Sequence, residues 1–310
     1  MASSATGNES GRHYCPATGS FAALDNPWHA AYDWTMERIE VRSPAVAGRF
    51  YPGRREVLLR EVDQYLEPES PNEETFENAI ACMVPHAGYM YSGHVAGAVY
   101  RRLPPRSRYV ILGPNHWGRG APVAMMSSGS WLTPLGQVEI DTELAANIRQ
   151  ECPLLTEDAA AHADEHSLEV QIPFLQRHAG SFRFVPIAIA MAHYDALELL
   201  GRAVADAIRR EEEPVMIVAS SDMNHYEPDL ITREKDDKAI EMILRLDPKG
   251  LLRVIRDEDV SMCGYAPTVV MLVAANELGA HEARLIRHAT SADTGGPADS
   301  VVGYAGIIVM

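Results

Sequence analysis

This chain of 310 residues lacks several features of exported, membrane-spanning and disulfide-bonded proteins. Its first residues, MASSATGNESGRHYC, have neither a basic start nor an apolar stretch, so no signal peptide is expected. The longest late apolar run, VVGYAGIIVM, is far shorter than the roughly 20 residues that a spanning helix needs. Disulfide or CxxC spacing is absent from its cysteines, Cys15, Cys82, Cys152 and Cys263. We therefore expect a cytoplasmic protein that does not enter membranes.

Basic residues are also scarce. The chain has 27 Lys and Arg against 43 Asp and Glu, which gives a formal net charge of −16. Nucleic acids and anionic membrane surfaces both require a basic footprint, so neither is an expected partner. The hydrophobic content of 46% and the charged content of 23% are ordinary for a globular protein with a large core.

The first 40 residues differ in composition from the rest. They are rich in Ser, Gly, Ala and Asn, show no sustained period and carry isolated aromatic residues. We interpret residues 1–40 as an N-terminal extension that could drape over the domain through those aromatics, or be partly disordered. Residues 41–310 are expected to form one domain, because α/β folds often exceed 250 residues.

Short apolar runs alternate with helical patterns from Val41 onward, which predicts a single layered α/β domain around a mostly parallel or mixed sheet. The predicted strands are Ile80–Val84, Tyr109–Leu112, Pro122–Met126, Phe182–Ile189, Val215–Ala219, Arg284–His288 and Val302–Val309. The predicted helices are Arg55–Leu66, Val95–Leu103, Thr142–Gln150, Glu165–Arg177, Ala196–Arg210, Thr232–Arg245, Pro248–Arg256 and Pro267–Leu278.

Three of the apolar runs end in polar side chains that could do chemistry. IACMVP is followed by His86, YVILGP leads to His116, and VMIVASS leads to Asp222 with His225 close behind. In open α/β sheets, ligands bind at the edge where the carboxyl ends of the strands meet. A single histidine after a strand is more often an ordinary turn residue, but three such ends favour a shared functional site.

Cys263 lies just before a strongly apolar helical stretch. A helix N-terminus lowers the pKa of a nearby thiol and favours the thiolate that binds metals. The alternative is a small buried hydrophobic residue, the common role of a free cysteine, which fits Cys82 in mid-strand well.

Two further segments give weaker signals. In AHADEHSLEVQIPFL, Glu165 and Glu169 would share a helix face, and His162 and His166 are also four apart. This is not an HExxH motif, and a solvated helix start is the favoured interpretation of His162. The loop SADTGGPADS lacks a phosphate-binding pattern; it could form a flap over the site, although a plain surface loop is favoured.

Six segments together carry a resemblance to a known family: SPAVAGRFYPG, PHAGYMYSG, GPNHWG, EHSLEVQIPFLQ, SSDMNHY and MCGYAP. In this order they resemble the MEMO family, whose bacterial and archaeal members are also called the B component of AmmeMemoRadiSam systems. The resemblance covers the chain from Val41 to the C-terminus. The family is similar in fold to the class III extradiol dioxygenases, which cleave aromatic rings with non-haem Fe(II) and O2.

The resemblance implies roles for particular residues. It makes His86, His116 and Cys263 the metal ligands, and it places Asp222 and His225 in the same pocket as catalytic groups. It also places His166 near this pocket. From their position beside the proposed ligands, and not from the resemblance, Tyr89, Tyr91, Trp117 and Tyr265 could form an aromatic wall that contacts the substrate together with His166.

The resemblance also implies a metal-dependent oxidoreductase that acts with O2 on a small aromatic or phenolic substrate. Fe(II) is the favoured metal, but a thiolate in place of a carboxylate ligand would also suit copper or zinc. Three alternatives stay open: metal handling, peptide binding without turnover, and zinc-assisted hydrolysis. A homodimer is one option for the oligomeric state.

Overall fold

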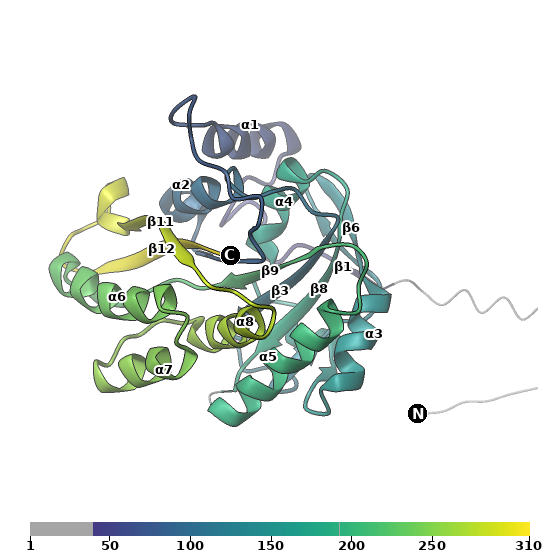
Figure 1. Ribbon diagram of the computed structural model, residues 1–310. Coiled ribbons are helices and arrows are strands. Elements are labelled where there is room, and N and C mark those ends of the chain that lie inside the picture. The colour runs from purple at the N-terminus through teal and green to yellow at the C-terminus, as the bar shows by residue number, and fades with distance from the viewer. Residues whose placement is uncertain (1–39, 192) are drawn as a thin grey trace, which may run out of the picture. The chain divides into compact units, whose positions relative to one another are not determined.

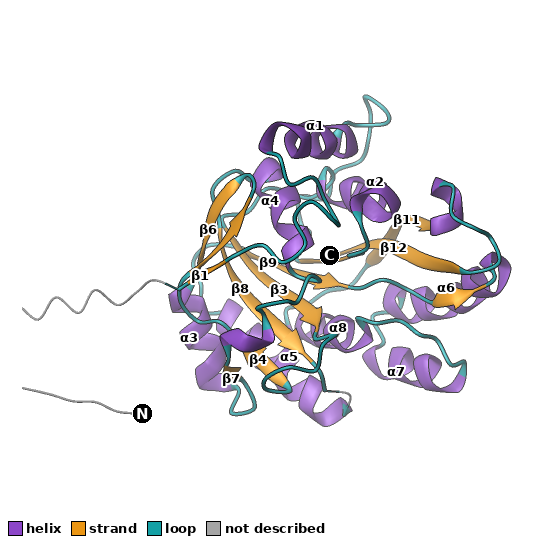
Figure 2. Cartoon of the chain, turned by 180° about the vertical axis from the view of Figure 1, so that it is seen from behind, coloured by secondary structure: helices purple, strands orange, loops and turns teal. Residues whose placement is uncertain are grey.

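The computed structural model describes residues 40–191 and 193–310. The predicted N-terminal extension, residues 1–40, therefore lies almost entirely outside the described residues. A twisted mixed sheet runs through the domain, with helices on both faces (Figures 1 and 2). The predicted α/β class with a parallel and mixed sheet is confirmed. None of the described helices has the length and apolar character needed to cross a membrane.

The strands run in the order β1-β5-β6-β8-β3-β9-β2-β12-β10 across the sheet. Those on the path are β1 (Val41–Arg42), β5 (Ser130–Thr133), β6 (Gly136–Ile140), β8 (Arg183–Ile189), β3 (Arg108–Pro114), β9 (Val215–Ser220), β2 (Ala81–Val84), β12 (Val301–Val309) and β10 (His225–Glu227). Off this path lie β11 (Ala283–Thr290), β4 (Val123–Met125) and β7 (Thr156–Glu157). The central strands β6, β8, β3, β9 and β2 are parallel, and β12 returns antiparallel to β2. The carboxyl ends of β8, β3, β9 and β2 therefore share one edge.

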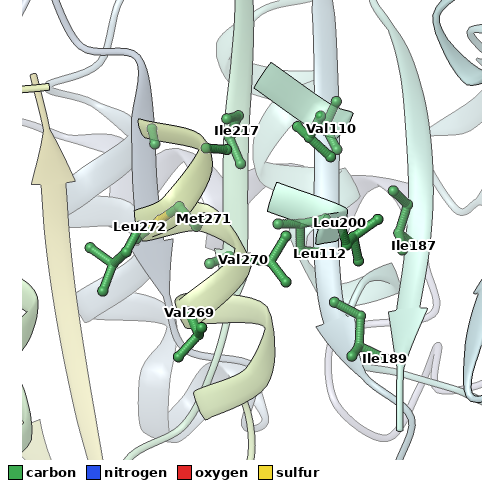
Figure 3. Packing of buried hydrophobic residues seen from close by; sticks show 14 of the residues in the cluster. Val110, Leu112, Ile187, Ile189, Leu200, Ile217, Val269, Val270, Met271 and Leu272 are labelled. Atoms are coloured by element: carbon green, nitrogen blue, oxygen red, sulfur yellow. The ribbon is translucent and has the colours of Figure 1, made fainter. Parts of the chain in front are cut away.

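The apolar runs become strands that are buried on both faces, as central parallel strands usually are. Because side chains alternate along a strand, Val110 and Leu112 of β3 face one core while Tyr109 and Ile111 face the other. Figure 3 shows the first core, where Leu112 packs beside Val270 and Leu200.

The helices divide between the two cores. The first core is covered by α3 (Thr142–Glu151), α5 (Tyr194–Ile208), α6 (Asp229–Leu244), α7 (Pro248–Asp257) and α8 (Tyr265–Glu277). The second core is covered by α1 (Arg55–Leu66), α2 (Tyr89–Tyr100) and α4 (Ile172–His178). Short 3-10 turns η1 (Ala159–Ala161), η2 (Glu169–Gln171) and η3 (Ser291–Thr294) complete the elements.

One predicted helix is wrong at its start. Residues 165–168 precede η2 and are not helical, so Glu165 and Glu169 do not share a helix face. The Glu165 side chain accepts from the backbone N–H of Ser167, which competes with helical hydrogen bonding. The guanidinium of Arg42 also donates a hydrogen bond to the backbone carbonyl oxygen of Glu165, at 2.6 Å.

The sequence patterns also missed the β5–β6 hairpin, together with β1, β7 and β10. These strands are short, and Pro134 interrupts the apolar pattern between β5 and β6. The start of α2 was misplaced as well, since the helix begins at Tyr89 rather than Val95. None of these errors affects the prediction that the central parallel strands end at a common edge.

Candidate metal centre

Three imidazoles converge at the carboxyl edge of the sheet. His86 follows β2, His116 follows β3, and His166 comes from the segment before η2. One ring nitrogen from each lies within 4.8 Å of the others. The rings of His116 and His166 are stacked with centroids 4.7 Å apart, and His86 stands edge-on to both. Nitrogen donors gathered this closely suit a transition metal.

Cys263 lies beside one member of this group, His86. The Sγ atom lies 3.1 Å from Nε2 of His86. Gly264 permits this approach, because a Cβ at that position would lie 2.4 Å from the carbonyl oxygen of Ser220. The helix α8 begins directly afterwards, with Pro267 in its first turn as predicted.

The pKa of this thiol differs from the expectation based on the helix dipole. Burial raises the pKa of Cys263 well above its usual value, and the charge of Asp222 acts in the same direction. Desolvation therefore outweighs the dipole, and the metal-free protein holds a protonated thiol. A metal would have to displace that proton on binding.

The proton positions of His86 and His116 follow from their partners. Ser220 donates its single hydroxyl proton to the Ser167 carbonyl, so its oxygen must accept from Nδ1–H of His86 at 3.0 Å. Glu165 accepts from Nδ1 of His116 at 2.9 Å. In the neutral form of each ring the lone pair is therefore on Nε2, the atom that a metal would bind.

The sequence patterns did not identify Glu165 as a partner of the metal centre. Its carboxylate also accepts from the backbone N–H of His116 and lies 3.5 Å from Nδ1 of His166. Burial alone would raise the pKa of Glu165, but the hydrogen bond and charge of His116 prevail and lower it to about 2. Glu165 is thus an ionised group that orients the ring of His116 and lies close to that of His166. Its position directly before His166 in EHSLEVQ was the available signal.

Burial favours the neutral form of two of the three imidazoles. Burial holds the pKa of His86 well below its usual range, and the neighbouring His116 acts in the same direction. Burial likewise lowers the pKa of His166 to about 4, with His86 contributing. Neutral rings bind metals without first losing a proton at pH 7.

The histidines open into a cavity of about 460 Å³. Its walls include four aromatic rings, those of Phe50, Tyr91, Tyr226 and Tyr304. The loop that was expected to be a plain surface loop also lines it, through Ser291, Gly296 and Pro297. That expectation is corrected, because η3 and the turn after it bring this loop to the cavity.

Asp222 lies in the same cavity and His225 lies nearby. Oδ1 of Asp222 accepts from the backbone N–H of His86 at 2.7 Å and of Ala87 at 3.2 Å. Burial raises the pKa of Asp222, while His225 and these two N–H groups act in the opposite direction. The ring of His225 is held by Ser261, whose carbonyl accepts from Nδ1 at 2.9 Å.

Several other residues proposed for substrate contact lie outside the cavity lining. Tyr89 is buried, and its hydroxyl donates to the Val170 carbonyl. Trp117 is 59% exposed and donates to the Asp164 carbonyl, while Tyr265 packs against the first core. His162, expected at a solvated helix start, is fully buried beside Trp131. These sites were named from sequence proximity alone, which does not determine side-chain direction.

A mixed α/β domain in which three histidines gather at the carboxyl edge of the sheet, with a cysteine beside one of them, defines a class of candidate metal-binding proteins. A family model described as "Memo-like protein" matches residues 42–308. The chain belongs to this family, as the sequence motifs indicated. It is 45% identical over 278 residues to a MEMO1 family protein of Pyrobaculum arsenaticum, covering 87% of this chain and 99% of that one.

One further relative and one solved structure are also similar to this chain. A MEMO1 family protein of Methanopyrus kandleri is 43% identical over 277 residues, covering 86% of this chain and 98% of its own length. A solved structure of an uncharacterized protein from Escherichia coli K12 has a TM-score of 0.49 at 16% identity, covering 74% of this chain and all of that one. The second similarity is too low to support any conclusion about function.

Proposed function

We propose that this protein is a non-haem Fe(II)-dependent oxidoreductase that acts with O2 on a small aromatic or phenolic substrate. The observation that carries the proposal is the convergence of three imidazoles on an aromatic-walled cavity, with a thiol beside one of them. Open coordination positions beside two histidines and an anionic ligand are typical of O2-activating iron sites.

The proposal assigns a role to each group around the centre. His86, His116 and Cys263 would hold the metal, with His166 as a further nitrogen donor, and the bound ion would supply the redox chemistry. Since Nδ1–H of His225 donates to Ser261, its Nε2 is free to accept a proton from a substrate hydroxyl. The cavity wall would exclude water from the reacting ring.

Metal handling without turnover is the second candidate, and the position of Cys263 favours it. A thiolate is a soft ligand that suits Cu(I) and Zn(II), and it is itself oxidised by O2. This candidate requires the same ligands but no proton acceptor such as His225.

The test is anaerobic loading with Fe(II), Cu(I) and Zn(II) in turn. The proposal predicts one Fe(II) per chain that binds nitric oxide, is lost in His86→Ala and Cys263→Ala, and supports O2 consumption with phenols. His281→Ala, a change at an exposed histidine, is the matched control and should retain the metal. Tight Cu(I) or Zn(II) binding without Fe(II) would instead support metal handling. Failure to retain any metal would overturn both.

A further inference from the structure

Asp222 is a buried carboxylate that forms no hydrogen bond or ion pair with any described Lys, Arg or His side chain. Its residue is 5% exposed, and Oδ1 accepts only from two backbone N–H groups. No described side chain donates to Oδ2, although Asp222 lines the cavity. Buried carboxylates are seldom left without a cation, because removal from water disfavours their charge. A ligand in the cavity could supply the missing cation.

The rest of the cavity wall is also suited to positive charge. The chain has 27 Lys and Arg, yet none of them is among the described residues that line this cavity. Four aromatic rings do line it, and the faces of aromatic rings attract cations. A carboxylate on a substrate would therefore meet Asp222 and ring faces but no basic side chain.

A metal ion does not reverse this preference. The charge of a divalent ion would be balanced by the Cys263 thiolate and by the ionised Glu165 beside His116, which leaves the charge of Asp222 uncompensated. A phenolate oxygen brought by the substrate would make the site more negative still. The net charge of −16 adds a long-range field that concentrates cations at the surface.

We propose that the cavity selects aromatic substrates that carry an ammonium group, with Asp222 as the counter-charge and the aromatic wall as the surface around it. The phenolic part of this substrate class rests on the proposed function, whereas the charge preference rests on the cavity alone. The preference can therefore be measured as binding, without turnover.

Three probes share one catechol ring and differ in the charge of the substituent: dopamine, 4-methylcatechol and 3,4-dihydroxyphenylacetate. Their affinities would be measured by calorimetry under anaerobic conditions, on metal-free protein and on protein loaded with redox-silent Zn(II). We expect dopamine to bind at least about tenfold more tightly than the acid, with 4-methylcatechol between them. Asp222→Asn should reduce the advantage of dopamine over 4-methylcatechol to within about twofold, because it keeps the acceptor oxygen but removes the charge.

Asp293→Asn is the matched control. Asp293 lies in η3 near the cavity wall but pairs with Arg233, so its loss changes the net charge equally without touching the lining. This variant should keep the full preference for dopamine. Equal or tighter binding of the acid, no binding of any probe, or an unchanged preference in Asp222→Asn would overturn the inference. If phenols of every charge are oxidised equally, the proposed function is supported and this inference fails. If dopamine is preferred but no O2 is consumed, this inference is supported and the proposed function fails.

Discussion

Both ends of strand β3 carry buried polar groups, but the two clusters are built differently. At the amino end, Arg108 donates to both oxygens of Asp141, at 2.6 and 3.0 Å, and also contacts Glu211. At the carboxyl end, His116 donates to Glu165 through Nδ1, and no described residue bonds its Nε2. Arg108, Asp141 and Glu211 pair with one another at the first end, while at the second end Nε2 of His116 is left without a partner among the described residues. The difference separates a polar cluster that stabilises the fold from one that is available to a ligand.

The largest expected effect comes from breaking the amino-end cluster. Arg108→Ala removes the cation and leaves the buried Asp141 without its partner, which should lower the free energy of unfolding by about 3–5 kcal/mol. Urea denaturation measures this loss. Metal stoichiometry of the folded variant should be unchanged, because Arg108 is at the opposite end of β3.

The control for this variant is Arg177→Ala, which breaks the half-exposed pair with Asp63. Exposed pairs contribute only about 0–1 kcal/mol, so little loss is expected. If Arg108→Ala cost no more than the control, the paired cluster would not be the stabilising element that its geometry indicates.

Acid should destabilise the folded protein, because the buried imidazole of His162 resists protonation in the folded state. Burial lowers the pKa of His162 to about 4, with the charge of Arg42 acting in the same direction. The unfolded chain therefore takes up this proton near pH 6.5, before the folded protein does. The associated stability is fully present above pH 6.5 and is lost as the pH falls toward 4, up to about 3 kcal/mol.

Urea denaturation across this pH range, compared between the wild type and His162→Gln, isolates this contribution. The variant should lose less stability between pH 6.5 and 4 than the wild type does. His281→Gln, at an exposed histidine, should leave the pH dependence unchanged. Parallel pH curves for the wild type and His162→Gln would show that His162 does not resist protonation in the folded state.

The smallest expected effect is on metal affinity, and it compares Glu165 at the carboxyl end of β3 with Glu211 at the amino end. Both oxygens of Glu165 accept from donors of His116, so Glu165→Gln would place an amide NH2 against one of them. Loss of such a partner typically weakens metal binding about 10–100-fold. Zn(II) affinity, measured by competition with a chromophoric chelator, tests this. Glu211→Gln changes a carboxylate at the other end of β3 and should leave the affinity unaltered; equal affinities in both variants would contradict the role of Glu165.

The patterns that predicted correctly were local ones. The run YVILGP is apolar at every position, so it had to be buried on both faces, and the structure makes it the centre of a parallel sheet. The placement of His86 and His116 at a common edge followed, because parallel strands align their carboxyl ends. The family resemblance then added Cys263, which no periodic pattern would have joined to these histidines.

What failed were statements about side-chain direction. Tyr89 stands three residues from His86 but turns into the second core, while Tyr304, far along the chain, faces the cavity. The predicted helix over Glu165 also failed, because Arg42 and Ser167 hold that segment through contacts that no helical period encodes.

The sequence by itself determined the central buried strands, the edge at which they end, and the two histidines, His86 and His116, that follow β2 and β3. Burial of continuous apolar runs is decided within a few residues, so it can be recognised in a linear pattern. Only the tertiary structure decided that Glu165 orients His116, that Ser220 sets the proton on His86, and that Asp222 accepts from the backbone N–H of His86. Those contacts join residues 49 to 136 positions apart, and they depend on how the finished layers pack.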